Sequence, residues 1–185
     1  NPDRLAYRAT LGASEMALSV NGPLSEKTSV LFSVRRSYLQ FLFGVIGLPF
    51  LPTFTDYTVK VKTKFNVKNE LTFISIGALD KFKLNTGLKN PTEEQQYILD
   101  YLPVNNQWNY AIGANYRHFR DNSFGTFILS RNMLYNEAYK YQGNDENVPE
   151  SKTLDYSSYE IENKIRYEEV LRTKGYKISY GAGAE

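Results

Sequence analysis

Few side chains in this sequence have the type and spacing that catalysis or metal binding requires. His118 is the only histidine, and there is no cysteine. A disulfide, a thiolate nucleophile and a cysteine zinc site are therefore excluded, and no better centre exists for a histidine-based triad. We interpret His118 as a residue at the end of a strand.

Alternating carboxylates suggest acid–base chemistry at first sight. Glu160 and Glu162 are two residues apart, and Glu168 follows closely. Lys164 and Arg166 continue the same alternation, so cross-strand ion pairs account for these residues without a catalytic role.

Two further stretches resemble known sites only superficially. Asp145, Glu146 and Glu150 share one polar segment, but they lack the spacing of a calcium-binding loop, which favours a solvated loop. Gly181 and Gly183 have no lysine at the spacing of a phosphate loop. We expect no enzyme activity, cofactor or metal, and a function based on binding.

Composition narrows the class of protein. The 185 residues are 42% hydrophobic and 23% charged, which is the range of a folded chain with one domain. A formal net charge of +2 without a lysine- or arginine-rich tract argues against nucleic-acid binding. The 15 Tyr and 11 Phe favour strands.

Alternation of apolar and polar residues predicts the elements. It predicts an all-β antiparallel up-and-down meander of about eight long strands, at 14–22, 28–38, 57–66, 71–80, 107–118, 124–135, 156–170 and 176–185. Short turns and long connectors alternate between them, which is typical of outer-membrane barrels. Thr92 as an N-cap and Pro103 as a stop predict a short helix within the long connector 83–106.

The lysines of the third strand assign an inside and an outside to such a barrel. Lys60, Lys62 and Lys64 alternate with apolar residues, and each lysine on the lipid face near the midplane would cost ~2 to 4 kcal/mol. The predicted lumen- or ligand-facing residues are Arg35, Lys60, Lys62, Lys64, Asn109, Asn115 and Arg117. The predicted lipid-facing residues are Tyr57, Val59, Val61, Phe65, Trp108, Tyr110, Ile112, Ile178 and Tyr180.

Several stretches also carry a family resemblance. They are Arg8 to Leu24 (RATLGASEMALSVNGPL), Ser33 to Leu42 (SVRRSYLQFL), Gly47 to Pro52 (GLPFLP), Asp56 to Tyr57, and Asn69 to Leu84 (NELTFISIGALDKFKL). These stretches resemble the start of the barrel in TonB-dependent outer-membrane receptors of the Bacteroidetes type. Nothing in the chain resembles the plug domain or the energy-coupling box of that family.

The resemblance implies a location, a function and partners. Residues 1–185 would form a single portion of a 22-stranded barrel in the bacterial outer membrane, with no plug and no second domain. The receptor would bind and import a nutrient by plug gating. Its partners would be outer-membrane lipid, the plug and remaining strands, a TonB-type energy-coupling protein of the inner membrane, and a small nutrient ligand.

Several alternatives stay open at this point. The chain is either a fragment, a small closed barrel, or a sheet that pairs with copies of itself. The apolar segment 41–54 either inserts into the barrel, caps a ligand, covers neighbouring loops or touches the outer leaflet. A passive channel, an enzyme with its site at the barrel rim, and a soluble ligand-binding barrel are the rival functions. We expect ligand contacts in the long connectors at 39–54, 83–106 and 137–153.

Overall fold

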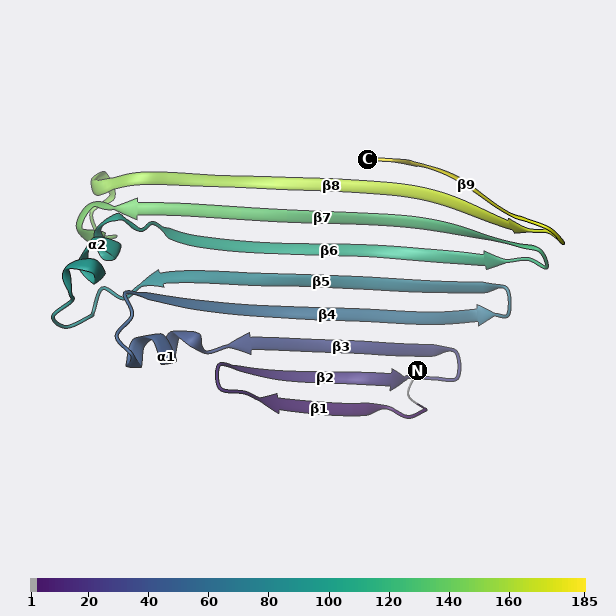
Figure 1. Cartoon of the computed structure of the whole chain (residues 1–185), viewed down its shortest axis with the longest axis horizontal. Coiled ribbons are helices and arrows are strands. Elements are labelled where there is room, and N and C mark those ends of the chain that lie inside the picture. The colour runs from purple at the N-terminus through teal and green to yellow at the C-terminus, as the bar shows by residue number, and fades with distance from the viewer. Residues whose placement is uncertain (1–2) are drawn as a thin grey trace.

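The computed structural model describes residues 3–185 and shows one nine-stranded antiparallel sheet (Figure 1). The strands are β1 (Ala6–Leu11), β2 (Glu15–Pro23), β3 (Thr28–Ser37), β4 (Phe50–Asn66), β5 (Asn69–Leu84), β6 (Val104–Phe119), β7 (Ser123–Tyr141), β8 (Lys152–Arg172) and β9 (Lys177–Ala184). Each strand pairs with its neighbours in the sequence, so β1 and β9 are the two edges of an open meander. The predicted all-β meander is confirmed.

The structure adds one strand before the first predicted one and extends the third predicted strand. The sheet has nine strands rather than eight, because Ala6–Leu11 pairs with β2 from Ala6 opposite Asn21 to Leu11 opposite Met16. The apolar segment 41–54 is not a loop throughout. Its second half opens β4, where Phe50 lies opposite Leu84 on β5. Both corrections depend on a partner strand that a local pattern does not reveal.

The long connectors gather at one end of the sheet, on the left of Figure 1. They hold two α-helices and two 3₁₀ turns, namely α1 (Leu39–Val45), α2 (Glu93–Tyr101), η1 (Gln142–Asn144) and η2 (Pro149–Ser151). The predicted helix is confirmed as α2. Its first turn is closed by a capping box, in which the Gln95 amide donates to Thr92 Oγ1 at 3.2 Å and the Thr92 amide donates to Gln95 Oε1 at 2.8 Å.

Short hairpin turns close the opposite end. Between β4 and β5 the Asn66 side chain accepts a hydrogen bond from the Lys68 amide at 2.9 Å, which is a local turn signal.

Gly22 on β2 has φ +149°, and a Cβ there would lie 2.5 Å from the Arg4 carbonyl oxygen. Only glycine allows the chain before β1 to pass so close to β2.

Buried apolar side chains are scarce in this sheet. Within residues 3–185 only Leu99, Val104 and Met133 are buried apolar residues. A small aromatic cluster joins α1 to the sheet, where Phe43 meets Phe50 edge-on at 5.6 Å and Phe50 stacks on Phe82 at 5.8 Å between ring centroids. No helix in this part of the chain has the length and apolar character needed to cross a bilayer.

Candidate functional site

The strand register sorts the side chains onto two faces of the sheet. Residues directly opposite each other in an antiparallel pair point to the same side, and successive residues alternate between sides. One row across five strands contains Tyr57, Gly77, Tyr110, Met133 and Ile161. The adjacent row on the other side contains Thr58, Ile76, Ala111, Asn132 and Glu162. We call the side of Tyr57 the apolar face and the side of Thr58 the polar face.

Two aromatic rows bound the apolar face. Toward the long connectors lie Trp108, Tyr135 and Tyr159, and toward the short turns lie Tyr116, Phe127 and Tyr167. On each of these strands the rows are eight residues apart, which is about 26 Å of strand at about 3.3 Å per residue. A tilt of about 40° reduces this to about 20 Å, close to the ~25 Å apolar band of a membrane barrel.

The predicted lipid-facing residues fall together on the apolar face. The register places there Tyr57, Val59, Val61, Trp108, Tyr110, Ile112, Ile178 and Tyr180. Phe65, the ninth, lies at the bulge between Lys64 and Asn66 and is 51% exposed. The contact of this face with lipid stays a prediction.

Large apolar side chains of this face are exposed. Tyr159 is 64% exposed, Ile161 51% and Leu129 47%. A continuous exposed apolar surface in a folded chain marks a contact with another protein or a membrane. The apolar face therefore requires a cover from outside residues 3–185.

A polar group that sequence reasoning missed interrupts the apolar face halfway between the aromatic rows. Arg131 donates from Nε to the Tyr110 hydroxyl at 3.1 Å and from a terminal nitrogen to Asn163 Oδ1 at 3.2 Å. An arginine at this depth on a lipid-facing surface costs ~2 to 4 kcal/mol. Its signal in the sequence is a charged residue in phase with Phe127, Leu129 and Met133.

The predicted lumen-facing residues share the polar face. Arg35 lies opposite Asp56, in a row across the strands that continues to Asn109. Lys62 lies in the same row as Asn115. The remaining three are Lys60, Lys64 and Arg117. That they line a lumen remains a prediction.

Charges on the polar face of β3–β8 divide along the strands. The half toward the long connectors carries the carboxylates Asp56, Asp80, Glu160 and Glu162, with Arg35 and Lys140 as its cations. The half toward the short turns carries Lys60, Lys62, Lys64, Arg117, Lys164, Arg166 and Arg172, with Glu70 and Glu168. The face is therefore acidic at one end and basic at the other. This division could not be read from the sequence, because it depends on which residues the register brings into one row.

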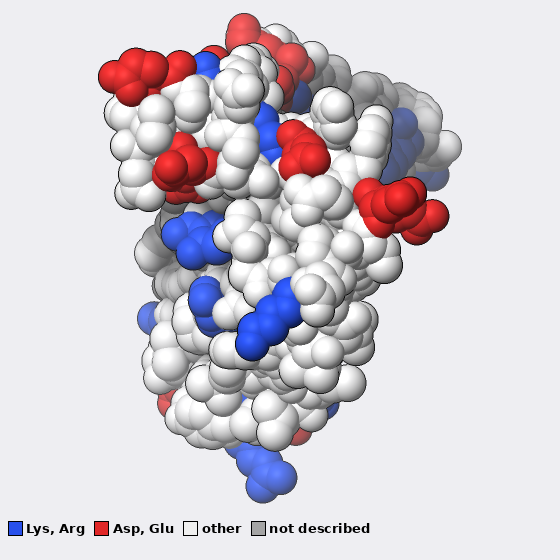
Figure 2. All heavy atoms as spheres, turned by 90° about the vertical axis from the view of Figure 1, so that its left-hand side faces the viewer, with Lys and Arg blue, Asp and Glu red and all other residues white. Residues whose placement is uncertain are grey.

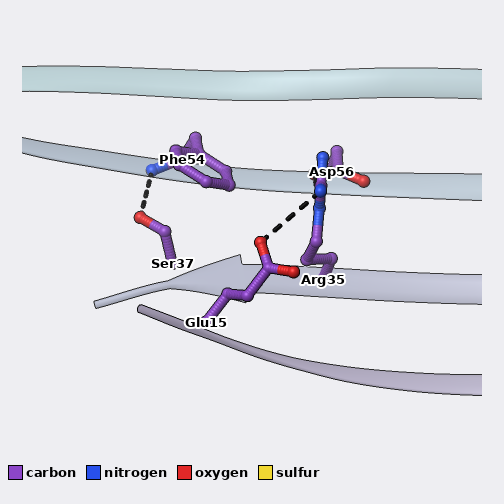
Figure 3. A network of polar contacts seen from close by, with 5 residues as sticks. All are labelled: Glu15, Arg35, Ser37, Phe54 and Asp56. Atoms are coloured by element: carbon purple, nitrogen blue, oxygen red, sulfur yellow. Dashed lines mark hydrogen bonds and ion pairs between the residues drawn. The ribbon is translucent and has the colours of Figure 1, made fainter. Parts of the chain in front are cut away.

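Arg35 organises the acidic half near the long connectors (Figure 3). Its Nε donates to Asp56 at 2.8 Å, and a terminal nitrogen reaches Glu15 at 3.4 Å. Next to it, the Phe54 amide donates to the Ser37 hydroxyl at 3.1 Å, and Ser37 is only 1% exposed. Because the ion pairs are partly exposed, each contributes at most about 1 kcal/mol, so the network orients side chains more than it stabilises the fold.

The basic half contains one well-shielded pair. Lys62 Nζ lies 2.9 Å from Glu70, whose side chain is 10% exposed. Lys64 and Arg117 flank Glu70 in the same row. Lys62 is thus paired with Glu70, and cations outnumber carboxylates at this end of the face.

Two shallow grooves lie on the polar face at the acidic end, with volumes of about 570 and 530 Å³, and share Phe54 and Asp80. The larger also touches Asn105, Gln107 and Asn136, and the smaller touches Asn109. Amides both donate and accept hydrogen bonds, so the grooves suit a polar ligand. They are the candidate ligand surface at the acidic end of the polar face.

The long connectors are tied together by a lysine that the sequence did not single out. Lys140 Nζ donates to the carbonyls of Leu99 and Leu102, the latter at 3.2 Å, and to Asn144 Oδ1 at 2.7 Å. Asn144 also donates to the Leu99 carbonyl at 2.9 Å. Burial lowers the pKa of Lys140, partly offset by Asp100. Three acceptors match the three donors of an ammonium at a helix C-terminus.

The helix of the apolar segment is not buried beneath its neighbours. In and after α1, Phe41 is 67% exposed, Val45 86% and Ile46 67%. Gln95 on α2 donates to the Gly47 carbonyl at 2.9 Å and fixes the segment to the neighbouring connector. The four roles considered for this segment remain predictions.

Candidate metal and catalytic groups do not converge. Among the described residues, no group of three His, Cys, Asp or Glu side chains could hold a metal ion. His118 lies 2.8 Å from Asn69 Oδ1 near the short turns. Asp145 accepts hydrogen bonds from Asn147 at 3.0 and 2.9 Å, which is a local turn contact.

Figure 2 looks onto the end with the long connectors, where charged side chains form separate patches on a mostly uncharged surface. The connectors therefore offer ion-pairing groups alongside uncharged contact area. A ligand approaching from this side would meet these patches before the two grooves.

Comparisons with known proteins identify solved structures with a similar fold. No family model and no curated protein matches the sequence. Two variants of the ferric enterobactin receptor PfeA from Pseudomonas aeruginosa are similar in structure, with TM-scores of 0.62 and 0.59 and identities of 14% and 15%. Each match covers 97% of this chain and 29% of the receptor chain. At these identities the likeness concerns the fold alone, and it supports no particular bacterial group. This chain has the fold of part of a receptor barrel.

Proposed function

We propose that this chain is a wall segment in the barrel of an outer-membrane TonB-dependent receptor that binds a nutrient and imports it. One observation carries the proposal. The open sheet has few buried apolar side chains among residues 3–185. One of its faces is apolar and is bounded by two aromatic rows, and the opposite face is charged. Lipid on one side and water on the other would satisfy both faces.

The charges decide which face meets lipid. The basic half of the polar face alone carries seven lysine and arginine side chains. With the opposite orientation these cations would face lipid, and each near the midplane would cost ~2 to 4 kcal/mol. The apolar face carries Arg131 as its single charge between the aromatic rows of β6–β8. The polar face is therefore assigned to the lumen.

The ligand would bind at the end with the long connectors. The acidic half of the polar face and its two grooves lie there. Barrels of this kind place long loops outside the cell and short turns in the periplasm. The plug, the remaining strands and a TonB-type energy-coupling protein would complete the transporter. The sequence of the N-terminal half favours the Bacteroidetes type.

Paired cysteine substitutions test the placement of the two faces. The sequence contains no cysteine, so Lys60→Cys and Val61→Cys each introduce one thiol at adjacent positions of β4. In the full receptor in isolated outer membranes, we expect a charged water-soluble maleimide to label position 60 at least tenfold faster than position 61.

Both variants should react fully after denaturation, which serves as the control for thiol content. Equal labelling of the two positions, faster labelling of position 61, or absence of the protein from the outer-membrane fraction would refute the proposal.

A further inference from the structure

The centre of the apolar face carries an unneutralised charge. Arg131 lies midway between Phe127 and Tyr135 on β7, and Asn163, opposite it on β8, lies midway between Tyr159 and Tyr167. Arg131 is exposed. Ile112, Leu129, Ile161 and Ile165 surround the pair and are 37%, 47%, 51% and 45% exposed. Arginine is one of the three residue types that most often dominate binding energy near the centre of a protein contact.

This chain does not neutralise Arg131. Within residues 3–185, none of the ion pairs includes it. Its two hydrogen-bond acceptors, Tyr110 and Asn163, are uncharged and leave three of the five guanidinium donors free. Both neighbouring strands are part of the described sheet, so other strands of a barrel wall would not reach this position on the same face.

A lipid phosphate is too far from Arg131 to serve as its anionic partner. Four residues, about 13 Å of strand, separate Arg131 from either aromatic row, where headgroups would begin. The bonds to Tyr110 and Asn163 hold the guanidinium across the strands, not along them toward a headgroup. A second copy related by a two-fold axis through this position would oppose Arg131 with another Arg131, and like charges repel.

We propose that the apolar face over β6–β8 is the docking surface for a membrane-embedded segment of a different protein, which supplies a carboxylate to Arg131. This inference rests on the proposed placement in the membrane. A carboxylate would accept two parallel hydrogen bonds from a guanidinium, and such a pair is strong and geometrically selective. The surrounding apolar ring would pack against the partner and exclude lipid from the ion pair.

A photoreactive side chain at Ile161 tests the docking surface in intact cells that carry the full receptor. The matched control is the same side chain at Phe32 on β3, which belongs to the same row of the apolar face as Arg131. We expect a discrete protein adduct at position 161 and lipid adducts at position 32. Arg131→Met should reduce the protein adduct at least tenfold, whereas Arg131→Lys should retain most of it.

The outcomes separate the two proposals. Lipid adducts at both positions would overturn the docking surface and leave the membrane placement intact. A protein adduct at position 161 that Arg131→Met does not reduce would also overturn it, because the ion pair would then play no part. Absence of lipid adducts at position 32 would refute the membrane placement and the docking surface with it. The variants are compared at equal amounts of folded receptor in the outer membrane.

Discussion

At the scale of single residues, Lys140 shows how one buried charge organises two connectors. Its ammonium satisfies carbonyls at the end of α2 and the side chain of Asn144 in η1. A cation at a helix C-terminus is favourable because the last carbonyls and the helix dipole both present negative charge there.

We expect Lys140→Met to open the connector around α2. The substitution removes the side-chain donor to the Leu102 carbonyl and to Asn144 Oδ1, which costs about 1 to 3 kcal/mol, while the Leu99 carbonyl keeps its hydrogen bond from Asn144. Amide hydrogen exchange within 93–101 should accelerate accordingly. Lys152→Met is the control, because Lys152 forms an exposed pair with Asp155 and should change exchange by less than about 1 kcal/mol. Equal effects of both substitutions would contradict the assigned role.

Gly77 is a position where the structure leaves no room for a side chain. A Cβ at this position would lie 2.6 Å from Tyr57 Cε1 and 2.9 Å from the Asn109 carbonyl oxygen. We expect Gly77→Ala to lower the free energy of unfolding by about 1 to 3 kcal/mol, since the neighbouring strand and ring must shift.

The matched control is Gly87→Ala, where a Cβ meets nothing within 4 Å. Urea titration of both variants in lipid vesicles would measure the difference. An unchanged midpoint for Gly77→Ala would show that Tyr57 moves aside at little cost.

At the scale of elements, α2 begins where the sequence predicts because its start signals are local. Thr92 and Gln95 exchange two hydrogen bonds, and Gln95 also reaches the Gly47 carbonyl. Gln95, which helps to start the helix, thus also holds it against the segment after α1. The strand boundaries behave differently, because Phe50 belongs to β4 only by virtue of Leu84 across from it.

We expect Thr92→Ala to destabilise α2 by about 1 kcal/mol, the usual cost of an N-cap. Thr92→Ser keeps the oxygen acceptor and should behave like the unsubstituted protein. Amide exchange at Gln95 and in the rest of the first turn would report the change. If Thr92→Ser were as destabilising as Thr92→Ala, packing of the threonine methyl group would be responsible instead of the cap.

At the scale of the whole molecule, the two faces of one sheet are suited to different solvents. The apolar face is bounded by aromatic rows, and the polar face changes from acidic to basic along the strands. In the proposed membrane placement, the stability of this sheet would come from lipid, neighbouring strands and partners more than from an interior core.

Placing a lysine on each face in turn tests this arrangement. We expect Val59→Lys, midway along the apolar face of β4, to destabilise the folded receptor by ~2 to 4 kcal/mol in lipid vesicles. Thr58→Lys on the polar face should change the free energy of unfolding by less than about 1 kcal/mol, since the added charge stays in water. Similar losses for both variants would contradict the assignment of the faces.

The sequence by itself determined the properties that arise within a short stretch of chain. The alternation from Tyr57 to Phe65 separates two faces because a strand has a period of two, and Thr92 starts a helix because its partner is three residues away. These local rules were enough for the meander, for α2 and for the grouping of the residues on two faces.

Only the tertiary structure decided what depends on register between strands. It brought Arg131 beside Asn163, collected the carboxylates at one end of the polar face, added β1 and extended β4 to Phe50. Register is set by the turn geometry together with the apolar patterns of both paired strands, so the pattern of one strand alone does not specify it.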